Sequence, residues 1–189
     1  MSPEQWLGSD KETLEILKTV QQLNLEDWWV CAGYVRKKVW DELSREKENI
    51  PLADIDVIYF NAVDLSEETE KSYEAELHCL LPGLPWSVKN QARMHLVNGL
   101  EPYESARDAI AKFPETVTAL GIKLDSADRF VFYAPHGIED LLNFHIRPTP
   151  YFRVDALRKR IFEQRRQKKN WSSNWPEVTF CSIKEEKCP

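Results

Sequence analysis

The sequence lacks closely spaced cysteines and long apolar runs. Its four cysteines, Cys31, Cys79, Cys181 and Cys188, are widely separated, so no Cys-x-x-Cys pair exists to build a zinc site. No run approaches the roughly 18 apolar residues that a membrane-spanning helix needs. The N-terminus has no basic segment followed by an apolar stretch, which is the pattern of a signal peptide. These absences predict a cytoplasmic protein that does not associate with membranes.

Several catalytic motifs and any sign of repetition are also missing. There is no Gly-x-x-x-x-Gly-Lys loop, which argues against a P-loop enzyme, and no Gly-x-Ser-x-Gly or His-Glu-x-x-His segment. The net charge of −6 means that the surface as a whole does not attract nucleic acid. Without a repeat or a linker, we expect one domain over residues 1–189, with a core of about 28–150 and an appended basic helix over 153–170.

The apolar pattern predicts an α/β fold. Helical spacing predicts three long helices, over residues 10–24, 35–45 and 66–80. Apolar and β-branched runs predict strands over residues 28–32, 55–60, 86–93, 116–124 and 129–134, of which the last two can form a hairpin. We therefore expect a mixed central sheet flanked by helices, with a C-terminal tail that frays from Thr179 onward.

Two aspartates at the start of one predicted strand carry the clearest chemical signal. Asp54 and Asp56 are two residues apart, so their side chains point to the same face of the strand. Two carboxylates placed together repel each other and lose hydration. A divalent cation between them removes both penalties, and Mg²⁺ prefers such oxygen ligands. The competing interpretation is an aspartate that only caps a loop before the strand.

A second segment, Cys31 to Arg36, leads from a predicted strand into a helix. We expect Gly33 to turn the chain there. The first helical turn then carries Arg36, Lys37 and Lys38, three cations that oppose the helix dipole unless an anion lies nearby. Backbone N–H groups at such a helix end can bind a phosphate. Alternatively, the two lysines simply point into water.

These two segments together resemble a known signature. Ala32-Gly33-x-Val35-Arg36 followed by Asp54-x-Asp56 is similar to the polymerase-β-type nucleotidyltransferases, and among them to the CCA-adding enzymes and bacterial poly(A) polymerases. Three further runs resemble a group of small bacterial nucleotidyltransferase family proteins: Trp86–His95, Phe113–Thr116 and Arg147–Pro150. The resemblance to that group extends over about residues 28–175, whereas the resemblance to the superfamily covers only the first two motifs.

The resemblance implies a nucleotidyltransferase fold and the Mg²⁺-dependent transfer of a nucleotidyl group from an NTP to an acceptor hydroxyl. It makes Asp54 and Asp56 the catalytic and metal-binding residues. It also implies nucleotide-binding roles for Gly33, Tyr34 and Arg36. Lys89, Asn90 and Arg93 are further candidates for nucleotide binding, because such crowded donors suit phosphate, ribose or base edges. The alternative for these three is a solvated edge strand. Where the CCA-adding pattern usually has an aspartate, this sequence has Lys37, so the substrate of that branch does not transfer directly.

One expected acid is missing. In the polymerase-β-type fold a third carboxylate comes from a neighbouring strand, but strand 86–93 offers only Ser87, Lys89 and Gln91 on the relevant face. Three interpretations stay open. The metal can rest on two aspartates with phosphate oxygens and water, or an acid from elsewhere can complete it, the candidates being Glu74, Asp108 and Glu115. In the third, the protein binds nucleotide without turnover.

The acceptor is open as well, since an RNA or a small molecule would fit the pattern. The basic helix over residues 153–170 is the one stretch of an acidic chain to which a nucleic acid could bind. Val154, Leu157 and Ile161 give that helix an apolar stripe for packing. Trp171 and Trp175 follow it, either packing the helix end on the core or offering a stacking surface.

Overall fold

The computed structural model describes residues 2–44, 51–169 and 171–181. In chain order, the elements are α1 (Pro3–Leu7), α2 (Lys11–Gln21), β1 (Trp29–Cys31), α3 (Gly33–Leu43), β2 (Ile55–Tyr59), α4 (Glu67–Leu80), β3 (Trp86–Asn90), α5 (Gln91–Asn98), α6 (Ala106–Ala111), β4 (Gly121–Leu124), β5 (Phe130–Tyr133), α7 (Glu139–Leu142), β6 (His145–Ile146), a 3₁₀ helix (Pro150–Arg153), α8 (Ala156–Lys168), α9 (Trp171–Asn174) and β7 (Thr179–Phe180).

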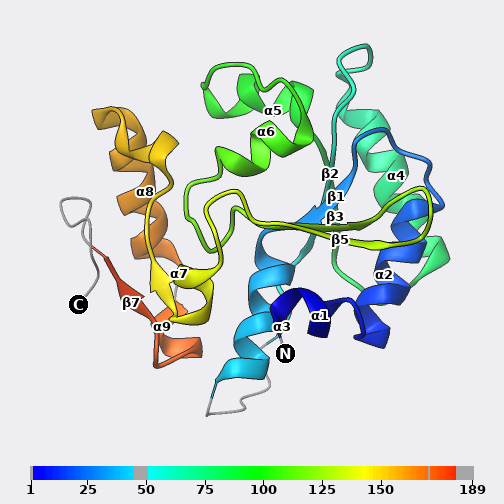
Figure 1. Ribbon diagram of the computed structural model, residues 1–189. Helices are drawn as coiled ribbons and strands as arrows, with labels where there is room; N and C mark the ends of the chain where they lie inside the picture. The colour runs from blue at the N-terminus through cyan, green and yellow to red at the C-terminus, as the bar shows by residue number, and fades with distance from the viewer. Residues whose placement is uncertain (1, 45–50, 170, 182–189) are drawn as a thin grey trace.

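A five-stranded mixed sheet occupies the centre of the structure (Figure 1). Its strand order is β3-β2-β1-β4-β5. Strands β2 and β3 run parallel, and α4 connects them, as a parallel pair requires a crossover. The other neighbouring pairs are antiparallel, and β4 and β5 form the predicted hairpin. The prediction of a mixed sheet flanked by helices is confirmed.

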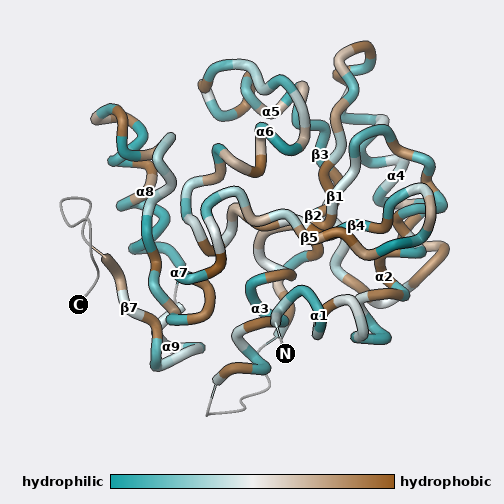
Figure 2. The backbone as a smooth tube through the Cα atoms, in the orientation of Figure 1, coloured by the Kyte–Doolittle hydropathy of each residue, from teal (hydrophilic) through white to brown (hydrophobic). Residues whose placement is uncertain are grey.

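The two faces of this sheet are covered unequally. Val30, Val57 and Ile122 point to a face where α2, α3 and α4 complete the main apolar core. On the opposite face, Trp29 and Ile58 pack with α6 in a much smaller cluster. Figure 2 shows the hydrophobic residues concentrated in the central strands and a mostly hydrophilic α8. The short α6 leaves part of the second face open.

The C-terminal elements share the main core. Phe162 of α8, Trp171 of α9 and Val178 belong to the same buried cluster as the residues of α2 and the sheet. In Figure 1, α8, α9 and β7 lie together at one side of the sheet. The basic helix is therefore packed into the fold and is more than an appendage to a core of residues 28–150. No helix in the described segments has the length and apolarity to cross a bilayer.

Three local predictions were wrong. The strand expected over 86–93 ends at Asn90, because the Asn90 side chain accepts the N–H of Ala92 at 3.1 Å and caps helix α5. The expected apolar stripe of α8 is only partly buried. Val154, which precedes the helix, is 70% exposed and Leu157 is 59% exposed, whereas Ile161 packs partly buried against the core beside buried Phe162.

The third wrong prediction concerns the tail. Thr179 and Phe180 do not fray, since they pair with His145 and Ile146 as strand β7. Residues 182–189 lie outside the described residues.

Gly121 of β4 marks a close approach between the sheet and α6. A Cβ at this position would lie 2.8 Å from Cδ1 of Ile110 and 3.0 Å from Cε3 of Trp29. We expect Gly121→Ala to lower the free energy of unfolding by about 1–3 kcal/mol through overpacking, as measured by urea denaturation. Adding Ile110→Val removes the nearer atom and should restore part of the loss. Full stability of Gly121→Ala alone would contradict this packing.

Candidate active site

Asp54 and Asp56 lie beside each other at the start of β2. Asp54 is exposed just before the strand, and Asp56 is half-buried, paired in register with Cys31 of β1 and Ser87 of β3. Both line a cleft of about 390 Å³, here called the cationic cleft. Its charged and aromatic lining comprises Arg36, Lys37, Asp54, Asp56, Arg165, Lys168, Lys169, Trp171 and Trp175.

The charge on Asp56 is unfavourable in this setting. Burial raises the pKa of Asp56 to about 6, and the neighbouring charge of Asp54 adds to the rise. Lys169 and Arg165 lower the pKa, but they only partly offset those two effects. Two close carboxylates, one with a raised pKa, form a donor pair that a divalent cation would stabilise.

The chemistry of this donor set fits Mg²⁺. Among the described residues, no group of three or more His, Cys, Asp or Glu side chains comes together as a metal site. Protein ligands would therefore be limited to the two carboxylates, and substrate oxygens and water would supply the rest. Magnesium usually binds in this way, with one or two carboxylates, several waters and phosphate oxygens.

Helix α3 begins directly against the two acids. The residue that turns the chain is Ala32, with φ 54° and ψ −117°, and not Gly33 as predicted. This backbone conformation is costly for a residue with a Cβ, and such strain is typical of functional sites. No side chain caps the helix. A Cβ on Gly33 would lie 3.8 Å from Oδ1 of Asp54, so the uncapped helix end adjoins the acids.

Arg36 places a buried cation at the same cleft. Its guanidinium lies 4.9 Å from the ring centroid of Trp171, 5.3 Å from Trp40 and 5.7 Å from Trp175. Its Nε atom is buried and has no hydrogen-bond partner among the described residues. Burial lowers the pKa of Arg36 to about 10, so the side chain stays charged at neutral pH. A buried cation with an unused donor favours an anionic ligand.

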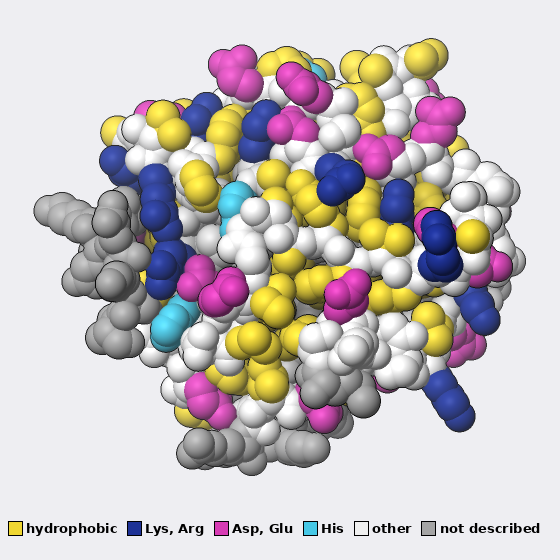
Figure 3. Space-filling view, in the orientation of Figure 1, with side chains coloured by type: hydrophobic (Ala, Val, Ile, Leu, Met, Phe, Trp, Pro, Cys, Tyr) yellow, Lys and Arg dark blue, Asp and Glu magenta, His cyan; other side chains and the backbone are white. Residues whose placement is uncertain are grey.

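Helix α8 supplies the other cations. Arg165 and Lys168 of its last turn and Lys169, the C-cap residue, line the cationic cleft together with Arg36. Figure 3 shows Lys and Arg side chains gathered over α8, beside hydrophobic side chains that cross the middle of the same face. The cleft therefore combines two acids with several cations, a composition suited to a metal-bound polyphosphate.

A second cleft of about 340 Å³ lies on the open face of the sheet. This aromatic cleft is lined by Ile58, Lys89, Met94, Tyr103, Lys112, Phe113, Phe152 and Ile161, among others. It shares Ala32, Asp56, Thr118 and Arg165 with the cationic cleft. The two clefts therefore meet at Asp56, one side basic and the other largely apolar.

The structure brings together some of the predicted site residues and separates others. Gly33, Arg36, Asp54 and Asp56 line one cleft, as the two motifs predicted. Lys89 lines the aromatic cleft, with its Nζ 3.5 Å from carboxylate oxygens of both Glu70 and Glu74.

Tyr34, Asn90 and Arg93, which are predicted to bind nucleotide, do not line either cleft. The Tyr34 side chain is buried, and its hydroxyl is 2.9 Å from that of Thr13. Fully buried Asn90 donates to the backbone oxygens of Asn61 and Asp64 at 2.7 and 2.8 Å. All three side chains have structural partners within the fold.

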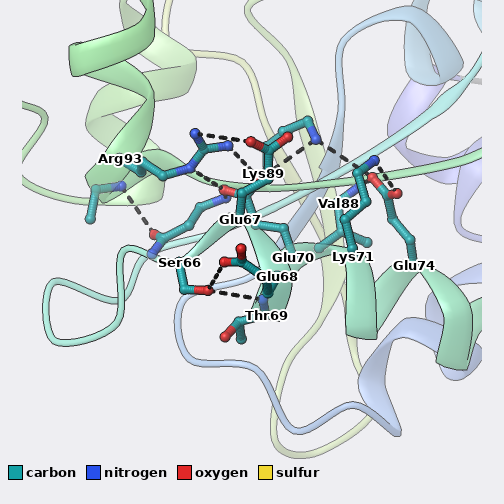
Figure 4. A network of polar contacts seen from close by, with 12 residues as sticks. Ser66, Glu67, Glu68, Thr69, Glu70, Lys71, Glu74, Val88, Lys89 and Arg93 are labelled. Atoms are coloured by element: carbon teal, nitrogen blue, oxygen red, sulfur yellow. Dashed lines mark hydrogen bonds and ion pairs between the residues drawn. The ribbon is translucent and has the colours of Figure 1, made fainter.

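Arg93 belongs to a network around a buried acid (Figure 4). Its Nε and Nη2 donate to the two oxygens of Glu70 at 3.0 and 2.7 Å, and Glu70 is fully buried. In the sequence, the polar run that contains Arg93 suggested nucleotide binding. In the structure, the packing of α4 on β3 buries the carboxylate of Glu70, and Arg93 supplies the positive charge and hydrogen bonds that compensate its burial.

The acids proposed to complete the metal site are engaged elsewhere. Glu74 accepts the N–H of Val88 at 3.0 Å and pairs with Lys71. Asp108 pairs with Lys112, and Glu115 pairs with Arg165. The two-aspartate interpretation is therefore the one that these contacts favour.

The flanking residues of the motif have partners too. Lys37 pairs with Asp41, and Lys38 pairs with Asp10 at 2.9 Å. Trp171 and Trp175 are packed, at 4% and 2% exposed.

Three cleft cations were missed as active-site residues in the sequence. Arg165, Lys168 and Lys169 formed part of a basic run that suggested nucleic-acid binding, and no spacing rule connects them with the aspartates. Only the packing of α8 through Phe162 brings them to the cleft.

Comparisons with known proteins agree with this geometry. A sequence model described as nucleotidyltransferase matches residues 18–180. One similar solved structure, an NMR structure described as a CCA-adding enzyme head domain, is 36% identical, with a TM-score of 0.84, and the match covers 95% of this chain and 94% of that chain. No curated protein matches this chain.

Two larger solved structures share the fold. One is a tRNA nucleotidyltransferase complexed with a primer tRNA and an ATP analogue, at 14% identity and a TM-score of 0.51, covering 89% of this chain and 47% of that one. The other is a tRNA-processing enzyme in an apo form, also at 14% and 0.51, covering 90% and 43%. This chain therefore spans less than half of each.

The strained charge on Asp56 leads to a stability prediction. In metal-free buffer at pH 8, Asp56→Asn should raise the free energy of unfolding by on the order of 1–2 kcal/mol, because asparagine removes the unfavourable charge. The pKa of Asp56 is about 6 when folded, against an ordinary 3.8, so the charge lowers stability as the pH rises through this range. The gain should therefore shrink between about pH 6 and pH 4.

Urea denaturation at several pH values measures this effect. Glu15→Gln, which neutralises an exposed acid on α2, serves as the control and should change little. A loss of stability for Asp56→Asn at pH 8 would contradict the interpretation.

The contacts of Arg93 with buried Glu70 give another prediction. Arg93→Gln should lower the free energy of unfolding by about 2–4 kcal/mol, because it removes the closest partner of buried Glu70. Nucleotide affinity, measured by calorimetric titration of the folded variant, should stay unchanged. The double variant Glu70→Gln, Arg93→Gln should recover part of the stability. A variant of full stability that no longer binds nucleotide would restore the ligand-binding assignment.

Proposed function

Because the chain belongs to the nucleotidyltransferase family, we propose that it transfers a nucleotidyl group from an NTP to an acceptor hydroxyl, with Mg²⁺ held by Asp54 and Asp56. The observation that carries this proposal is the convergence, in one cleft, of the two acids, the uncapped end of α3 and the buried cation of Arg36. Each feature is unfavourable alone, and a metal-bound triphosphate would compensate all of them.

Each part of the cationic cleft would have its own role in binding the NTP. The free N–H groups at the start of α3 and the guanidinium of Arg36 bind the β- and γ-phosphates. Lys168 and Lys169 add positive potential on the other wall of the cleft. The bound metal would neutralise charge on the triphosphate and on the departing pyrophosphate. Asp54 and Asp56 would hold that metal beside the junction of the two clefts, which would place the α-phosphate there.

The aromatic cleft is the proposed entry for the acceptor. In-line displacement places the attacking oxygen opposite the leaving pyrophosphate. With the pyrophosphate in the cationic cleft, the opposite side of Asp56 is the aromatic cleft. A cation lies over an aromatic ring in its lining, with Nζ of Lys112 5.8 Å from the ring centroid of Tyr103.

That combination suits the 3′ end of an RNA, for which rings and cations provide stacking and phosphate contacts. The tRNA complex of a structural neighbour supports the same choice. A small hydroxyl compound is the alternative acceptor.

A second candidate is a nucleotide-binding protein without turnover. The observation that favours it is that the described residues offer two aligned carboxylates and no third. Tight NTP binding with Mg²⁺ and no pyrophosphate release with any acceptor would support this candidate.

The decisive experiment measures pyrophosphate release from each NTP with Mg²⁺, in the presence of short RNAs or small hydroxyl acceptors. The double variant Asp54→Asn, Asp56→Asn should lose at least about 100-fold in rate, because the metal loses its protein ligands. Calorimetry should show that its NTP affinity no longer depends on Mg²⁺.

A matched control, Glu15→Gln with Glu76→Gln, neutralises two exposed acids that line neither cleft. It should keep the full rate. Unchanged turnover after loss of both aspartates would overturn the proposed function.

A further inference from the structure

An ion pair between a buried acid and a partly exposed arginine lies at the junction of the two clefts. Glu115 is fully buried, and its Oε1 and Oε2 accept from Nε and Nη2 of Arg165 at 2.7 and 3.2 Å. The hydroxyl of Thr118 donates to Oε2 at 2.7 Å. A carboxylate without water requires such partners, so Glu115 holds the guanidinium of Arg165 in one orientation.

The segment that carries Glu115 is itself fixed. The backbone N–H of Thr149 donates to the oxygen of Pro114 at 3.1 Å, and its hydroxyl donates to the oxygen of Phe113 at 2.7 Å. The N–H of Thr116 donates to the oxygen of Arg147 at 2.9 Å. These bonds leave the carboxylate of Glu115 little freedom, and Arg165 is correspondingly well positioned.

Arg165 also reaches the site. Its side chain is 36% exposed and lines both clefts, as Asp56 does. Only Nε and Nη2 are used on Glu115, and within the described part of the chain Nη1 makes no hydrogen bond. Burial alone would lower the pKa of Arg165, but the bonds to Glu115 outweigh it and raise the pKa. The guanidinium is therefore a permanent cation with one free amino group.

We propose that Arg165 is a catalytic residue whose Nη1 binds the α-phosphate during nucleotidyl transfer, and that Glu115 is the positioning residue that aims it. This inference rests on the proposed function. In the step concerned, the acceptor oxygen bonds to the α-phosphorus, and the bond to pyrophosphate breaks. The electron pair leaves with pyrophosphate, and the hydroxyl proton passes to water. A fixed cation beside the α-phosphate stabilises the charge on its oxygens in the transition state.

The location of Arg165 favours a catalytic role over a purely structural one. A purely structural arginine would satisfy Glu115 from within the core. Arg165 instead stands where the aromatic and cationic clefts meet, beside Asp56, with a donor left over. That position is the one at which the proposed attacking and leaving groups come together.

Arg165→Lys tests the proposal most directly. Lysine keeps the charge and an ion pair with Glu115 but loses the planar fork that leaves one amino group free. We expect the variant to fold, to bind NTP within about three-fold of wild type, and to lose kcat by about ten-fold or more. Arg166→Gln, at the neighbouring exposed position, is the control and should keep the wild-type kcat.

A second variant, Arg165→Gln with Glu115→Gln, removes both charges so that none is left buried alone. Its kcat should fall by about 100-fold or more at nearly unchanged NTP affinity. With an NTP that carries sulfur on the α-phosphate, wild type should slow down markedly. The double variant should slow less, since the contact is already absent. A structural role would not change this ratio.

The outcomes separate the two hypotheses. Wild-type turnover together with full kcat in Arg165→Lys, or in a folded double variant, overturns the role of Arg165 alone. If the double variant does not fold, Arg165→Lys decides the question. A wild-type chain that binds NTP but releases no pyrophosphate overturns the proposed function and this role with it.

Discussion

The repulsion between Asp54 and Asp56 is the constraint on which the rest of the site depends. Two carboxylates share the start of one strand, and burial with mutual repulsion raises the pKa of Asp56 to about 6. The groups around these two acids carry positive charge: the uncapped N-terminus of α3, the guanidinium of Arg36 stacked on Trp171, and the last turn of α8. The two aspartates and the surrounding cations lie in one cleft without forming ion pairs with each other. Such a site has the electrostatics to bind a metal ion together with a polyphosphate.

The C-terminal segment contributes to the core and the site at once. Phe162 and Trp171 are buried in the main apolar cluster, and this packing fixes the direction in which the cations of α8 point. Trp171 also stacks on Arg36, so the arginine of the N-terminal motif is held by a residue far along the chain. Folding of the segment and formation of the site are therefore coupled, and loss of α9 would affect both.

An incompletely covered sheet creates room for substrates. Helices α2, α3 and α4 cover one face, whereas on the opposite face α6 packs against one part and an open cleft lies at the other. Asp56 points to this open face, because side chains alternate along β2. A strand otherwise buried on both sides thus exposes its one acid where two clefts meet. The same alternation leaves Ile58 as an apolar wall for the cleft that we assign to the acceptor.

The sequence by itself determined the features that depend on local spacing. Alternation along a strand put Asp54 and Asp56 together, and the apolar pattern placed the main helices and strands. Contacts between distant segments were decided only by the tertiary structure. Arg93 was assigned to nucleotide, but α4 supplies Glu70 as its partner. Arg165 reaches the site because α8 packs on the core through Phe162, and there it meets Glu115. Local periodicity fixes which way a side chain points, whereas the partner it meets depends on how whole elements pack.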